Sequence, residues 1–208
     1  MKNISVWCAD IGSIKANKFG WCKKDLLEQN VILGKDIKQF ALGIADDLTK
    51  GYKVALGFEC PLFIPISENP LNLTSARNGE KNRAWSASAG SQVLSIGLAE
   101  MVWIFKNIKE NCKNEIKITF DWNRFINEDI NLFIWEAFVS GQSKTSLHEN
   151  DAQKALDKFC YLCLSKKIEE TADITAENPF NLAACALMRA NISKEINLLS
   201  ENCLVVKV

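Results

Sequence analysis

The sequence has only one histidine, His148, and its charges cancel, with 25 basic and 25 acidic residues in a chain of 208. A neutral chain lacks the overall basic surface that is typical of proteins binding nucleic acid or anionic membranes, although a local basic groove is compatible with it. The spacing that is typical of zinc ligands is also scarce. Cys160 and Cys163 form the single CxxC pair of the sequence, and they lie inside an apolar helical pattern. A structural zinc site is therefore not expected.

Long hydrophobic runs are missing as well. The longest apolar stretch, 93–105, is interrupted by Ser95, Gly97 and Glu100 and is shorter than the roughly 20 apolar residues that cross a bilayer. Residues 1–12 become acidic too early for a signal peptide. The eight cysteines are scattered, which is typical of reduced thiols. These absences predict a cytoplasmic protein with no membrane partner.

The residues that are present suffice for one substantial core, because 48% of them are hydrophobic. Residues 1–208 are therefore expected to form a single α/β domain. A polar stretch at about 67–85 has no periodicity, and loops of this length are usually functional or disordered. A C-terminal extension with a helix and a strand is expected from about 172.

Hydrophobic periodicity predicts the order of the elements. A strand at 54–59 follows a helix, so it is expected to lie parallel to the first strand. A capping box of Ser146 and Glu149 is expected to open the last long helix. The predicted strands are 4–9, 19–22, 31–33, 54–59, 116–122, one within 129–139, and 203–206. The predicted helices are 36–50, one ending near 111, 146–168 and 178–191.

Three acids fall where strands or a helix would bury them. Asp10 ends the first strand, Glu59 lies inside the apolar run GFECPLF, and Asp151 extends the apolar stripe of its helix together with His148. Buried carboxylates are costly unless they are paired or bind a cation. Two of these acids also have structural alternatives, which are turn chemistry for Asp10 and a bond to a neighbouring backbone group or to His148 for Asp151. Together the three acids predict an oxygen-rich site for Mg²⁺ or Mn²⁺.

These motifs resemble the ribonuclease H-like superfamily. The first strand ends in Asp10, GFECPLFIP carries Glu59, and His148, Asp151 and Ala152 are similar to the last motif of RuvC-type resolvases. GFECPLFIP followed by a loop and R-x-W also resembles a family of predicted nucleases with this fold. The similarity runs in order through most of residues 1–165. One departure is that His148 stands where such enzymes often have a fourth acid.

The resemblance implies a ribonuclease H-like mixed central sheet flanked by helices. It also implies a metal-dependent nuclease that hydrolyses phosphodiester bonds in DNA or RNA. Asp10, Glu59 and Asp151 would hold Mg²⁺ or Mn²⁺, and His148 would bind metal or move a proton. Glu136 is expected to face solvent, with a contribution to the second metal site as the alternative. A homodimer stays open as the assembly.

The polar loop supplies candidates for binding the substrate. Arg77, Lys81 and Arg83 are candidates for phosphate contacts, because the arginine fork matches phosphate. A solvated surface loop is the structural alternative. Trp85 is a candidate for stacking on a base, with an ordinary core tryptophan as the alternative.

Two other function classes remain open. A non-catalytic binding module that kept the fold is favoured by the neutral charge and by His148 in place of an acid. An ATP-binding phosphotransferase of the actin and sugar-kinase type is less well supported, because such enzymes usually need two domains and the chain has no P-loop motif.

Overall fold

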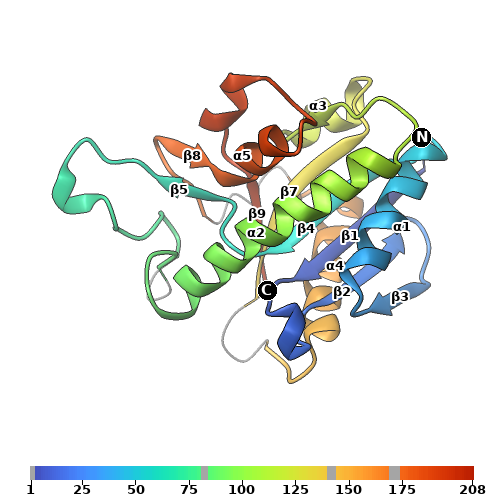
Figure 1. The fold of residues 1–208 in the computed structure, drawn as a ribbon, viewed down its shortest axis with the longest axis horizontal. Helices are drawn as coiled ribbons and strands as arrows, with labels where there is room; N and C mark the ends of the chain where they lie inside the picture. Colours follow the sequence, from blue (N-terminus) through green and yellow to red (C-terminus); the bar gives the residue numbers. More distant parts are fainter. Residues whose placement is uncertain (1–2, 81–83, 140–143, 169–173) are drawn as a thin grey trace.

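The computed structural model describes residues 3–80, 84–139, 144–168 and 174–208. Its centre is a mixed sheet of seven strands in the order β3-β2-β1-β4-β7, with β6 and β9 pairing with different parts of β7 (Figure 1). β1 pairs antiparallel with β2, and β2 with β3, whereas β1, β4 and β7 are parallel. The strands are β1 Ile4–Asp10, β2 Gly20–Asp25, β3 Val31–Gly34, β4 Lys53–Glu59, β6 Ile118–Thr119, β7 Leu132–Phe138 and β9 Leu204–Lys207.

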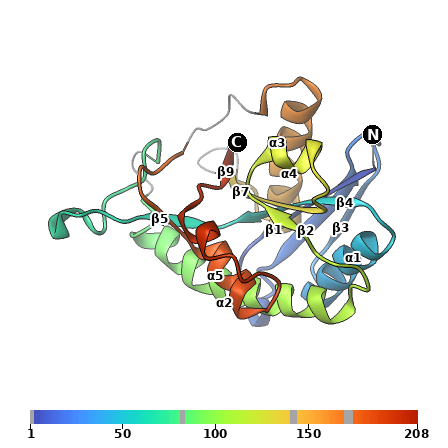
Figure 2. The same cartoon turned by 90° about the horizontal axis from the view of Figure 1, so that it is seen from above.

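Helices cover both faces of this sheet (Figure 2). One face carries α1 (Ile37–Thr49), α2 (Ser88–Asn111) and α5 (Leu182–Arg189), which share one apolar core. The other carries α3 (Trp122–Asn127) and α4 (His148–Leu164), which share a second core. The expected α/β architecture, a mixed sheet flanked by helices, is therefore confirmed.

Local signals explain why several elements form where they were expected. Asp36 caps α1 by accepting hydrogen bonds from the backbone N–H groups of Lys38 and Gln39. The apolar stripe of α1 then faces the sheet, where Phe40 packs edge-on against Trp7. The strands expected near 4–9, 31–33, 54–59 and 203–206, and the one within 129–139, are all present.

Other boundaries differ from the predictions. The strand expected at 116–122 is reduced to β6, because the side chain of Asp121 caps α3 instead. The Ser146 capping box is wrong: α4 begins after Leu147 without a side-chain cap, and it ends at Leu164. The helix expected from 178 begins only at Leu182. The residues before it form β8 (Pro179–Asn181), which pairs with β5 (Phe63–Pro65) in a second, two-stranded sheet.

Helix α2 has the length and composition of a membrane-crossing helix, and 28% of its most apolar 18-residue window is buried. In this structure α2 contacts both α1 and α5 (Figure 1). Its buried face includes Met101, Ile104 and Phe105, which belong to the core under the sheet. The chain is a compact α/β domain that contains this helix in its helical layer.

Candidate metal centre

Two parallel strands bring two of the predicted acids together. Asp10 is the last residue of β1 and Glu59 the last residue of β4, and the two are directly paired in the sheet register. Both are buried, with 2% of Asp10 and 7% of Glu59 exposed. The β1–β4 pairing therefore fixes two carboxylates side by side at the carboxyl ends of the strands.

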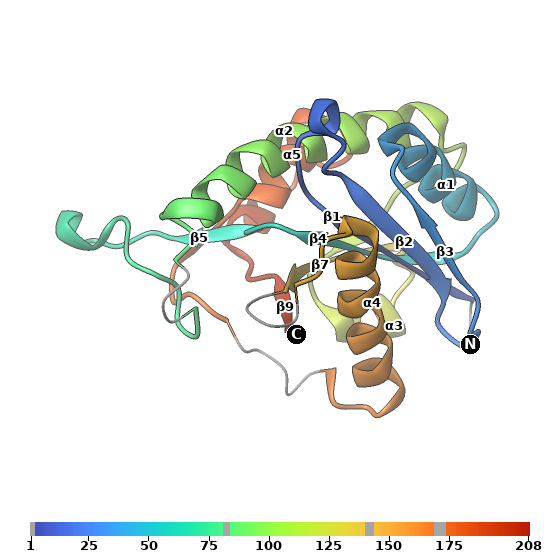
Figure 3. The ribbon, with the colours of Figure 1, turned by 90° about the horizontal axis from the view of Figure 1, so that it is seen from below.

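Helix α4, which lies on the face of the sheet opposite α1 and α2, adds the third acid (Figure 3). Its first turn lies against Gly20 of β2, the residue that pairs with Asp10. A Cβ atom on Gly20 would lie 2.2 Å from the backbone nitrogen of Glu149, so only glycine allows this approach. Asp151 is thereby buried beside the strand ends. Ligand oxygens from Asp10, Glu59 and Asp151 all lie within 4.8 Å of one another.

Each of the three carboxylates contacts a polar group from residues 144–148, which helps to fix its orientation. These groups are a histidine ring nitrogen, a lysine ammonium and a backbone N–H group. The contacts are His148 Nδ1 to Asp10 Oδ2 at 2.6 Å, Lys144 Nζ to Glu59 Oε1 at 2.8 Å, and Thr145 N to Asp151 Oδ1 at 2.7 Å.

These contacts do not neutralise the cluster. Burial raises the pKa of Asp10 to about 7, against the lowering effect of Lys144. Burial and the charge of Asp10 raise the pKa of Glu59 to about 8. Glu59 Oε2 is buried without a donor among the described residues, because its neighbour Asp10 is also a carboxylate and offers only a shared proton. The buried, oxygen-only triad is therefore compatible with a divalent cation.

Two further charged residues, which the sequence patterns did not identify, act electrostatically on the centre. Lys144 follows residues outside the described range and has no local signal. Glu100 lies on the buried face of α2, and its Oε2 has no partner among the described residues. Burial raises the pKa of Glu100 to about 7, and its charge contributes to the raised pKa of Asp10. An acid on the apolar stripe of a helix was the signal that could have revealed it.

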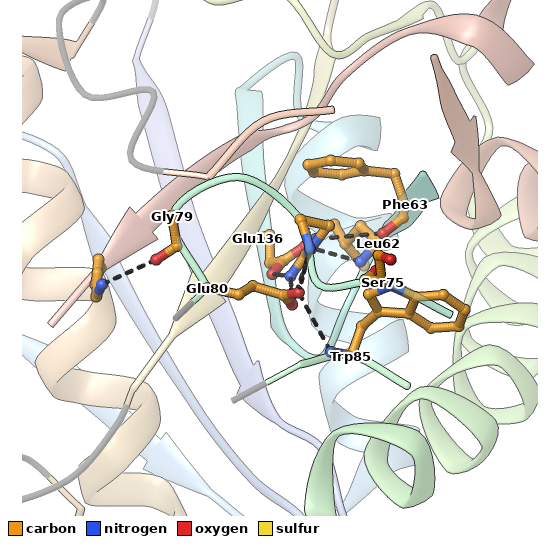
Figure 4. Close-up of polar contacts among 9 residues, drawn as sticks. Leu62, Phe63, Ser75, Gly79, Glu80, Trp85 and Glu136 are labelled. Carbon is orange, nitrogen blue, oxygen red and sulfur yellow. Dashed lines mark hydrogen bonds and ion pairs between the residues drawn. The ribbon is translucent and has the colours of Figure 1, made fainter. Parts of the chain in front are cut away.

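Arg77 does not lie on a solvated loop. Its side chain is fully buried, and its two Nη atoms each donate to Glu136 at 2.7 Å (Figure 4). Glu80 pairs with the same guanidinium, which stacks over Phe63 at 4.5 Å. The expectation of an exposed phosphate contact at Arg77 is therefore wrong in this structure, because the guanidinium is buried and paired with two carboxylates.

Glu136 does not face solvent as expected. It is 1% exposed, because β7 is an inner strand whose two faces are both covered by helices. Trp85 is half-buried and donates its Nε1–H to the carbonyl of Ser75 at 2.9 Å. Lys81 and Arg83 lie outside the described residues.

The chain matches no protein-family model, no curated protein and no solved structure. Its function is therefore inferred from the geometry of the site, starting with the acid cluster of Asp10, Glu59 and Asp151.

Proposed function

We propose that this protein is a metal-dependent nuclease of the ribonuclease H-like type, which hydrolyses phosphodiester bonds in DNA or RNA. The observation that carries the proposal is the acid cluster, where three buried carboxylates converge within 4.8 Å and one buried oxygen has no donor. Such a group is costly unless a cation compensates it. Oxygen-only ligand sets are preferred by Mg²⁺ and Mn²⁺.

The chain's own residues have distinct roles in this proposal. Asp10, Glu59 and Asp151 would hold one or two divalent ions, which when bound supply an activated water and stabilise the leaving oxygen. His148 orients Asp10 through Nδ1. Its side chain is 34% exposed, so it is within reach of solvent and is a candidate to move a proton.

The fold supports the same proposal. Antiparallel pairing in β1–β2–β3 and parallel pairing in β1–β4–β7 make the mixed sheet that the sequence resemblance implies. The two strand acids lie at the carboxyl ends of β1 and β4, where ligands bind in open α/β sheets. Because fold alone does not fix function, the acid cluster remains the main support.

A non-catalytic binding module is the second candidate, and one contact favours it. The ammonium of Lys144 lies 2.8 Å from Glu59 and already places a positive charge at the cluster. A chain that had lost metal binding would benefit from this internal cation. The two candidates differ in whether a divalent ion binds.

The test is calorimetric titration of Mg²⁺ and Mn²⁺ into the wild type, Asp10→Asn and Asp46→Asn. Asp46 is a matched control, because it is an exposed acid whose ion pair among the described residues is with Lys50. We expect saturable binding in the wild type and in Asp46→Asn, loss of binding in Asp10→Asn, and metal-dependent cleavage of DNA or RNA that follows the same pattern. Binding that survives Asp10→Asn, or no binding with or without nucleic acid, would contradict the proposal.

A further inference from the structure

A pocket of about 380 Å³ opens beside the acid cluster. It shares Glu59 and Lys144 with that cluster, so a ligand in the pocket lies next to any group held by the acids. This volume is within the range of small-molecule sites. The remaining lining residues are mainly apolar, and they include Pro61, Ala84, Trp85, Val93, Phe138 and Val139.

The Trp85 wall is held in place by the buried arginine network (Figure 4). Glu80 accepts hydrogen bonds from the backbone N–H groups of Arg77 and Trp85, and it pairs with the Arg77 guanidinium. Arg77 in turn is anchored to Glu136 of β7. The indole Nε1–H is fixed by Ser75. Arg77 is therefore a positioning residue, which connects the Trp85 segment rigidly to the sheet that carries the acids.

The N-terminus of α2 forms another wall of the pocket. Its capping position, Ala87, supplies no side-chain hydrogen bond, and the Gly90 N–H donates to the carbonyl of Ala87. The first-turn donors left for a ligand among the described residues are the backbone N–H groups of Ser88 and Ala89. Ser88 has a φ of 48°, an uncommon conformation for a residue other than glycine. A Cβ on Gly90 would lie 2.6 Å from the carbonyl oxygen of Ala84, so glycine lets the Trp85 segment lie directly on the helix.

We propose that this pocket binds the nucleobase of the nucleotide whose phosphate lies on the acid cluster. Trp85 is its stacking partner, and the first turn of α2 donates to acceptors on the base edge. The inference rests on the proposed function, because the acid cluster identifies the neighbouring group as a phosphodiester.

Three features favour a base over a second phosphate. The walls are largely apolar, and an indole and a phenyl ring line them. Glu59 and Lys144 both line the pocket and are paired with each other at 2.8 Å, so the ammonium is already engaged with a carboxylate when a second phosphate would need it. Arg77, the cation of the inner wall, is already paired with both Glu80 and Glu136, so it is not available to an anion.

The test measures binding of a labelled, phosphorothioate-linked hexathymidylate by fluorescence anisotropy, with Mg²⁺ and with EDTA. The same backbone with abasic residues reports the contribution of the bases. Ala89→Phe places a ring in the pocket, and Gln92→Phe places the same ring on an exposed part of the same helix outside it. Trp85→Ala removes the stacking surface, whereas Trp85→Phe retains an aromatic ring.

We expect Ala89→Phe and Trp85→Ala to lose about 5- to 150-fold in affinity for the base-bearing strand, the range that one base–aromatic stack covers. Affinity for the abasic strand should stay unchanged, and Gln92→Phe should bind both strands as the wild type does. Trp85→Phe, which keeps a ring but loses the Nε1–H bond to Ser75, should lose less affinity for the base-bearing strand than Trp85→Ala. Equal binding of the two strands by the wild type, no binding at all, or an unchanged base preference in Ala89→Phe would overturn the proposal.

The two proposals can fail separately. Base-dependent binding in EDTA, sensitive to Ala89→Phe, would stand even if calorimetry finds no metal at Asp10, and it would then identify a binding module. Metal binding and cleavage with no base preference would leave the nuclease and remove the base pocket.

Discussion

Two groups of buried carboxylates lie on neighbouring strands, and they differ in how their charge is compensated. On β7, Glu136 shares the guanidinium of Arg77 with Glu80, and the two acids raise the pKa of Arg77 against the lowering effect of burial. On β1 and β4, Asp10 and Glu59 lie together; among the described residues, the half-exposed Lys144 contacts Glu59 and the His148 ring contacts Asp10. Their pKa values rise to about 7 and about 8.

The difference separates a structural site from a candidate functional one. A carboxylate with a buried, bidentate arginine has its acceptors satisfied and needs no ligand. A carboxylate that is buried among other carboxylates is stabilised only by a proton or by an exchangeable cation. The arginine network therefore fixes the shape of the region, while the acid cluster keeps the capacity to bind.

The largest effect is expected from breaking the compensated group. Arg77→Met leaves Glu136 and Glu80 buried without their cation, which costs about 3–5 kcal/mol of stability in comparable pairs. Urea-induced unfolding at pH 7 would measure this loss in the free energy of unfolding.

A surface ion pair supplies the control for that experiment. Arg124 contacts Glu128 while both side chains are about half exposed. Arg124→Met should therefore cost less than about 1 kcal/mol. Equal effects of the two substitutions would show that burial does not set the strength of the Arg77 network.

The acid cluster on β1 and β4 should make the protein less stable as the pH rises. The pKa of Glu59 is about 8 in the folded protein and 4.5 in its ordinary state. Between these values the folded state holds more protons than the unfolded state, so the free energy of unfolding falls as pH rises from about 4.5 to about 8. Glu59→Gln removes this fall. In EDTA at pH 8 it should be more stable than the wild type by at least about 1 kcal/mol, the equivalent of one pKa unit.

The same substitution on the neighbouring strand is the matched control. Glu136→Gln weakens a bidentate pair with Arg77 and should destabilise the protein at pH 8. Denaturant unfolding of both variants at pH 5 and pH 8 would show effects of opposite sign at the higher pH. If Glu59→Gln were also destabilising at pH 8, the negative charge of Glu59 would not be a cost to the folded state.

Local patterns predicted the parts of the fold that local physics determines. The cap at Asp36 and the near-continuous apolar runs of β1 and β4 are visible in short windows of sequence. The small β5–β8 sheet is not, because each strand has three residues and Phe63 pairs with Asn181 across more than a hundred positions. The side chain of Asp121 accepts a hydrogen bond from Arg124 N and caps α3, and this helix replaces the end of the strand that alternation predicted at 116–122.

The candidate site shows the same limit. Asp10, Glu59 and Asp151 could be found because each breaks an apolar pattern at a defined point. The partner of Arg77 could not, since Glu136 lies 59 positions away and alternation along β7 gives no sign of it. Lys144 had no pattern at all. Sequence reasoning located the acids that would bind a cation and missed the residues that determine which charges are already satisfied. Nucleic acid binding, a homodimer and a cytoplasmic location remain predictions.

The smallest expected effect concerns Lys144, the one cation already at the acid cluster among the described residues. Its ammonium competes with a divalent ion for Glu59, but it also lowers the pKa values of Asp10 and Glu59 and so opposes protonation. At pH 9, above the pKa values of about 7 for Asp10 and about 8 for Glu59, protonation contributes less and the competition dominates. Lys144→Met should then tighten Mg²⁺ binding by up to about fivefold, because a half-exposed ion pair contributes no more than about 1 kcal/mol. Lys144→Arg keeps the charge and should leave the affinity measured by calorimetry near that of the wild type. Weaker Mg²⁺ binding in Lys144→Met at pH 9 would mean that the ammonium supports the metal centre, and the contrast with the permanently paired Arg77 would be smaller than the structure indicates.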